Sequence, residues 1–82
     1  MLYDRFVSAL CRKGYVRTDD EDNVELTVDS NEYESADDVV RMIEDICDSF
    51  HVECFLDRDA TNDEGMTFCI DDNSFLLVVI LA

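Results

Sequence analysis

The chain of 82 residues contains no proline and no tryptophan, and its only glycines are Gly14 and Gly65. The missing proline and the scarce glycine exclude a flexible linker and a low-complexity tract, because such segments are rich in these residues. The hydrophobic fraction of 48% also excludes a disordered acidic chain, which has too little apolar surface to bury. We therefore expect a single domain spanning residues 1–82, since this length suits one hydrophobic core.

Basic residues are scarce and unevenly placed. Six of them face 21 acids, for a formal net charge of −15. Residues 1–17 hold four bases and one acid, a net charge of +3, whereas residues 18–82 hold two bases and 20 acids, a net charge of −18. Self-repulsion of this size opposes the compact state. Such a charge indicates either adaptation to high salt or a role for the electric field.

Long apolar runs are missing as well. The C-terminal run at residues 75–81 has seven apolar residues, far fewer than the ~20 that a membrane helix needs. Asp4 and Arg5 interrupt the stretch in which a signal peptide has its apolar region. Four cysteines at irregular spacing are typical of reduced cytosolic thiols. We expect a soluble cytoplasmic protein that does not bind membranes.

Two amphipathic helices are predicted by the spacing of apolar residues. Apolar side chains recur at helical spacing in residues 2–13 and again in residues 36–50. Gly14 follows the first segment as a left-handed stop, and Ser35 precedes the second as an N-cap. The outer face of the second helix carries five acids and Arg41.

Strands are predicted for most of the remaining chain. Residues 24–29 alternate apolar and polar side chains, which is typical of a strand with one solvated face. The other predicted strands are residues 15–18, 52–56, 66–70 and 75–81. The order α-β-β-α-β-β-β predicts an α+β fold, with two helices on one face of a small antiparallel sheet of four or five strands. Because the last strand is apolar on both faces, we expect it to be central or to lie at a dimer contact.

A possible zinc set consists of Cys47, His51, Cys54 and Cys69. No C-x2-C knuckle accompanies these residues, and a free cysteine packs well as a small apolar residue. We therefore expect four free thiols and no bound zinc.

A possible cation site lies in the loop at residues 57–68, where oxygen-bearing side chains alternate as in a calcium-binding loop. Asn62 stands where such a loop has glycine, and Phe68 stands where it has a bidentate glutamate. The pattern favours a solvated loop, so we expect no metal and no cofactor.

Catalytic motifs are lacking. His51 is the only histidine, and no serine or cysteine lies in a nucleophile elbow or a phosphate-binding loop. Carboxylates are so abundant that a pair of them does not indicate acid–base chemistry. We expect a binding protein, not an enzyme.

The acidic residues themselves form the candidate binding surface. Neutral polar side chains solvate a surface equally well, so a net charge of −18 over residues 18–82 indicates a positively charged partner. The predicted partner-binding residues are Asp19, Asp20, Glu21, Asp22, Glu25, Asp29, Glu32, Glu34, Asp37, Asp38, Glu44, Asp45 and Asp48.

The acid-rich stretches at residues 19–22, 37–38 and 44–45, in a chain of this size, resemble a class of phage-encoded inhibitors. These are the small acidic DNA mimics, including anti-CRISPR and anti-restriction proteins, which share neither a motif nor one fold. The resemblance implies a basic nucleic-acid-binding target in the host cytoplasm, such as a CRISPR effector or a restriction enzyme. It implies no direct contact with nucleic acid, and it leaves a homodimer open.

Two alternatives also account for the charge. A generic acidic interaction module, such as an adaptor or an immunity-type partner, binds a basic protein without competing with nucleic acid. A domain from a halophile carries acids as an adaptation to salt, and here aspartate outnumbers glutamate 14 to 7 and Lys13 is the only lysine. Four cysteines, five phenylalanines and a basic N-terminal segment argue against salt adaptation.

We expect the protein to show a cooperative thermal transition at ~0.1 M salt, where the Debye length is ~10 Å. Its apolar stripes are sufficient for a core, whereas a halophile domain needs concentrated salt to screen its self-repulsion. Circular dichroism across a salt series measures this. A chain that is disordered at low salt and folds only near molar salt would support the halophile alternative.

Overall fold

The computed structural model describes residues 2–59, 61, 65–72 and 74–82. In order along the chain, the elements are α1 (Leu2–Cys11), β1 (Tyr15–Thr18), β2 (Val24–Val28), the short 3-10 helix η1 (Ser30–Glu32), α2 (Ala36–Ser49), β3 (Cys54–Asp57), β4 (Gly65–Ile70) and β5 (Phe75–Leu81). The predicted α+β class and element order are confirmed. Element boundaries differ from the predicted ones by at most two residues.

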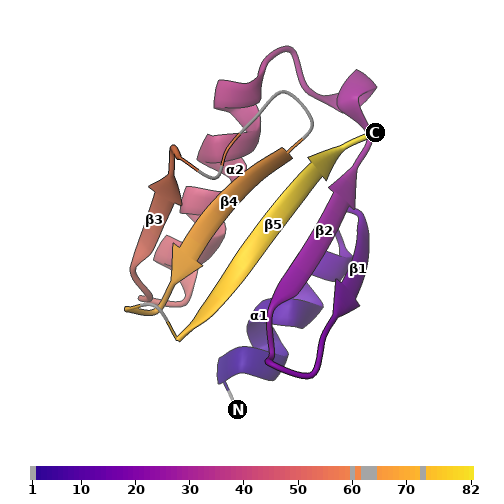
Figure 1. The fold of residues 1–82 in the computed structure, drawn as a ribbon. Coiled ribbons are helices and arrows are strands. Elements are labelled where there is room, and N and C mark those ends of the chain that lie inside the picture. The colour runs from indigo at the N-terminus through magenta and orange to yellow at the C-terminus, as the bar shows by residue number, and fades with distance from the viewer. Residues whose placement is uncertain (1, 60, 62–64, 73) are drawn as a thin grey trace.

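The strands form one sheet in the order β1-β2-β5-β4-β3 (Figure 1). β5 is central, which is one of the two positions that its apolar faces predicted. The prediction of an antiparallel sheet is wrong for one pair, because β2 and β5 run parallel while the other three pairs are antiparallel. The order of the connections explains this. α2 carries the chain back along the sheet, so β3 runs in the same direction as β2. Two hairpin reversals then leave β5 in that same direction.

Both helices cover one face of the sheet, and the core lies between these two layers (Figure 1). The alternation in β2 is the one predicted, since Val24, Leu26 and Val28 are buried while Glu25 and Thr27 are partly exposed. The buried core consists of Phe6, Leu10, Val24, Leu26, Val28, Val39, Ile43, Cys47, Met66, Phe68, Ile70, Leu77 and Val79. The helices supply five of these residues and the strands supply the others, so the sheet forms the larger part of the core.

The helix ends differ in detail from the predicted ones. Ser35 is the N-cap of α2, but its side chain makes no capping hydrogen bond. Instead, the carboxylate of Asp38 accepts the backbone N–H of Glu34 at 3.2 Å. Asp37 and Asp38 in the first turn also suit the positive end of the helix dipole. None of the described helices is long and apolar enough to cross a bilayer.

Gly14 lies after the turn that follows α1, and the fold requires glycine there for a different reason from the left-handed stop that the sequence suggested. Neither glycine has a positive φ. A Cβ atom at Gly14 would overlap the carbonyl oxygen of Thr27 in β2 and would lie 3.3 Å from Cδ1 of Leu26. The missing side chain therefore lets β1 begin directly against β2 after the helix turn.

We expect Gly14→Ala to lower the free energy of unfolding by roughly 1–3 kcal/mol, the usual cost of an overpacked site. The new methyl group has to displace backbone in β2, which cannot move away as a side chain can. Urea denaturation measures the change, with Lys13→Ala at the exposed neighbouring position as the control. Equal stability of Gly14→Ala and the wild-type protein would show that this turn relaxes freely.

Candidate partner-binding surface

The predicted partner-binding acids fall into three separate groups. The first group lies on α2 and on the segment that leads to it: Asp29, Glu32, Glu34, Asp37, Asp38, Glu44, Asp45 and Asp48. The second group is the β1–β2 turn, residues 19–22, and the third is Glu25 alone. α2 covers the β3–β4 side of the sheet, whereas the β1–β2 turn lies on the other side (Figure 1). The sequence predicted one surface, but the fold separates the turn from the helix.

The outer side of α2 is the densest array of acids. Val39, Ile43 and Cys47 are buried, so the carboxylates lie on the opposite side of the helix. Four of its five acids are exposed and Asp38 is half-buried. Arg41 is the one base among them. The whole face spans about 16.5 Å along the helix axis, at ~1.5 Å of rise per residue.

One flank of this face is less negative than the other. Asp38 and Asp45 line a shallow groove of about 330 Å³, and Lys13 and Arg41 line it as well. These two bases offset part of the negative field on that flank. The other three acids of α2 do not line the groove.

The β1–β2 turn uses one of its acids structurally. The carboxylate of Asp19 accepts the backbone N–H of Glu21 at 2.8 Å and that of Asn23 at 3.0 Å. These hydrogen bonds favour the charged form and lower the pKa of Asp19. Asn23 also ties the turn to the sheet, because its side-chain oxygen accepts the N–H of Leu76 at 3.0 Å.

Glu25 lies on the sheet face that the helices do not cover. Its register partner in β1 is Arg17, so opposite charges stand side by side on neighbouring strands. Glu25 therefore belongs neither to the α2 surface nor to the turn.

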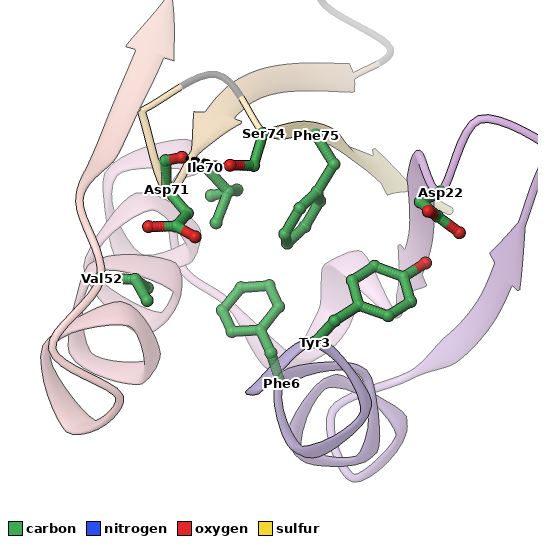
Figure 2. Close-up of a pocket in the computed structure, with 8 residues that line it drawn as sticks. All are labelled: Tyr3, Phe6, Asp22, Val52, Ile70, Asp71, Ser74 and Phe75. Carbon is green, nitrogen blue, oxygen red and sulfur yellow. Dashed lines mark hydrogen bonds between the residues drawn. The ribbon is translucent and has the colours of Figure 1, made fainter. Parts of the chain in front are cut away.

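A pocket of about 210 Å³ opens at the end of the sheet beside α1 (Figure 2). The aromatic rings of Tyr3, Phe6 and Phe75 form its walls, and Asp22 and Asp71 lie on opposite sides of it. The sequence did not indicate this pocket, because its lining comes from separate segments that only the fold brings together. Its volume lies below the ~300–1,000 Å³ of typical ligand pockets.

Tyr3 is the unusual residue in this pocket. Its ring packs edge-on against that of Phe75, with the centroids 5.1 Å apart. The hydroxyl oxygen is buried and has no hydrogen-bond partner among the described residues. Burial, followed by the nearby carboxylate of Asp22, raises the pKa of Tyr3.

The residues of the possible zinc set do not converge. Cys47 and Cys54 lie on the core side of the sheet, while Cys69 is paired with Phe55 on the opposite face. His51 is exposed and has a φ of 56°. No group of three metal-ligating side chains gathers in the part of the chain that the structure describes. A hydrogen bond with Cys54, together with burial, raises the pKa of Cys47, which packs in the core as a neutral thiol.

The possible cation loop is only partly within the described residues, since Ala60, Asn62, Asp63 and Glu64 lie outside them. In the described part, the carboxylate of Asp57 accepts the N–H of Asp59 at 3.1 Å. The hydroxyl of Thr61 donates to the carbonyl oxygen of Asp57 at 2.7 Å. These are the local hydrogen bonds of an ordinary polar turn.

Comparison with protein-family models, with curated proteins and with solved structures finds no match for this chain. Its function is therefore inferred from its own surface chemistry.

We expect Tyr3→Phe to leave the free energy of unfolding unchanged or to raise it by up to about 1 kcal/mol. The substitution removes a hydroxyl whose loss of hydration is not repaid by a hydrogen bond. Chemical denaturation measures the change, with Tyr15→Phe as the control because the Tyr15 side chain is exposed. A loss of more than about 1 kcal/mol would show that the Tyr3 hydroxyl does have a hydrogen-bond partner.

Proposed function

We propose that this protein mimics nucleic acid and inhibits a basic nucleic-acid-binding protein by occupying its binding site with the outer side of α2. The spacing of charge supports this proposal. Five carboxylates and Arg41 give a net charge of −4 on this face. That is one charge per about 4 Å of helix axis, close to the ~3.4 Å per phosphate along one strand of B-DNA.

The anchoring of α2 supports the same role. Val39, Ile43 and Cys47 are almost completely buried, and they fix the helix on the sheet. A surface whose backbone is already ordered loses little conformational entropy when it binds. The acids at the end of β2 and before α2 extend the negative field beyond the first turn of the helix: Asp29, Glu32 and Glu34.

The charge of α1 and the turn after it differs in sign from that of α2, so the domain is an electric dipole that a charged partner can orient. Arg5 and Arg12 are exposed on α1 and on the turn that follows it, whereas α2 is acidic. Both helices lie on the same side of the sheet (Figure 1). A basic groove therefore attracts the α2 side and repels the α1 side, which orients the domain during encounter.

A CRISPR effector or a restriction enzyme is the target class that the resemblance to phage inhibitors implies, because the nucleic-acid channel of such an enzyme is basic. The inhibition would be steric and electrostatic, with no chemical step. Competition with DNA separates this mechanism from that of an adaptor, which binds a basic protein away from its nucleic-acid site.

We expect the wild-type protein to displace DNA from at least one member of a panel of purified CRISPR effectors and restriction endonucleases. The double variant Glu44→Lys with Asp48→Lys should bind that enzyme at least tenfold more weakly, since close interfacial charge pairs couple by ~1.5–7 kcal/mol. Both positions are exposed, lie outside the groove and leave the first turn of α2 intact. Competition fluorescence anisotropy with labelled DNA, at two salt concentrations, measures the inhibition and its expected weakening by salt.

The matched control is Asp20→Lys with Glu21→Lys, which changes the net charge equally at the β1–β2 turn. This control should retain most of the inhibition if the α2 face is the site. Equal losses in both double variants would show that net charge alone matters. Binding to an enzyme of the panel that DNA does not displace would contradict mimicry and support the adaptor alternative.

A further inference from the structure

The pocket beside α1 has an apolar interior. Phe6 and Ile70 form its floor, since each of them is only 1% exposed. The ring of Phe75 packs edge-on against both other rings, with its centroid 5.1 Å from that of Tyr3 and 5.7 Å from that of Phe6. The side chain of Val52 closes the wall on the α2 side (Figure 2). Such a surface favours an aliphatic chain over water.

Two acids lie at opposite ends of this apolar interior. Asp22 of the β1–β2 turn lies beside the hydroxyl end of Tyr3, and Asp71 of the β4–β5 turn lies on the other side (Figure 2). Backbone hydrogen bonds hold both turns: the N–H of Asp22 donates to the carbonyl oxygen of Asp19 at 3.3 Å, and that of Asp71 to the carbonyl oxygen of Glu53 at 2.8 Å. Both aspartates are exposed, so their carboxylates are open to a ligand.

The charge of the pocket is negative throughout. No lysine, arginine or histidine is among its described lining residues. Burial, followed by the carboxylates of the β1–β2 turn and of Asp4, raises the pKa of Tyr3, so several acids act on this wall. The Tyr3 hydroxyl also lacks a hydrogen-bond partner among the described residues, and a ligand N–H group at the Asp22 end can supply one. A ligand that matches the pocket therefore carries positive charge and N–H donors.

The size of the pocket restricts that ligand to a few atoms. A volume of about 210 Å³ corresponds to about seven water-sized groups of ~30 Å³ each. A chain of four methylene groups with a nitrogen at each end has six such groups. The pocket thus holds a small diamine but not a drug-sized molecule.

We propose that this pocket binds a short aliphatic diamine, with the methylene chain against the aromatic rings and one ammonium group at each of Asp22 and Asp71. Alkylammonium groups are charged at neutral pH, since their pKa is ~10.4. An ammonium group beside an aromatic ring also gains a cation–π attraction. The site does not rest on the proposed inhibitory function, because its lining contains none of the α2 acids, so the two proposals can fail independently.

Titration of the wild-type protein with 1,4-diaminobutane at ~0.15 M salt, followed by two-dimensional NMR, tests the site. We expect saturable shift changes concentrated at Tyr3, Phe6, Ser74 and Phe75. Two matched ligands separate the contributions: butylamine has a chain of the same length with one ammonium group, and 1,4-butanediol has no charge. The diamine should bind at least about threefold more tightly than butylamine, the effect of one further exposed ion pair, and the diol should cause no saturable change.

The variants Asp22→Asn and Asp71→Asn each remove one carboxylate. Asparagine keeps the size of the side chain and tolerates the positive φ of these positions, 65° and 53°. Each variant should weaken diamine binding at least about threefold, to the level of butylamine, because one ammonium group loses its partner. The matched controls are Asp20→Asn and Asp72→Asn, which make the same change in charge in the same turns but outside the pocket lining, and they should bind the diamine as the wild-type protein does.

The wild-type titration does not depend on how the variants fold. Shift changes spread over the acids of α2 instead of the pocket would show a general attraction of cations to an acidic chain, and would overturn the site. Equal affinities for the diamine and butylamine would show that the pocket does not bind both ammonium groups. Equal losses in the pocket variants and in their controls would likewise contradict the assignment of Asp22 and Asp71.

Discussion

The sheet buries only one of its faces, and this burial decides where the helices and the charged side chains lie (Figure 1). Both helices pack on the same face, and the described core contains apolar side chains with no buried polar or charged residue. The charged residues that the structure describes are then confined to the helix backs, the turns and the open face. The strong amphipathicity of α2 follows, because the stripe that includes Val39 and Ile43 has to face the sheet and the acids have to face solvent.

β5 contributes side chains both to the buried core and to the open face of the sheet. β5 pairs with β2 on one side and β4 on the other, and its core side supplies Leu77 and Val79. Its other side is also apolar, and none of the described helices or strands covers it (Figure 1). A second layer of helices covers such a face in a larger α/β protein, whereas both described α-helices of this chain lie on the first face.

Two surfaces of different chemistry result, on opposite sides of the sheet. The helix side carries a lopsided field, in which the acids of α2 lie beside the bases of α1 and its turn. The open side carries the exposed apolar side chains of Tyr15, Phe55 and Leu76. Glu53 and Asp72 lie beside Phe55 at one edge of this side. Electrostatic attraction acts over a long range, and salt screens it. Apolar contact acts only at short range, and salt does not screen it.

The sequence alone determined the elements, because helix and strand periodicities are local properties: residues 36–50 and 24–29 have the apolar spacing of the helix and strand that they form. It also determined that the described acids stay out of the buried core. Three features depend on contacts between distant parts of the chain: the parallel pairing of β2 with β5, the close approach that requires Gly14, and the separation of the acids at residues 19–22 from those on α2. The tertiary structure alone placed Phe55 and Cys69 together, on the face away from Cys47. Which strands pair, and in which register, depends on contacts between residues far apart in the chain, and local periodicity does not specify those contacts.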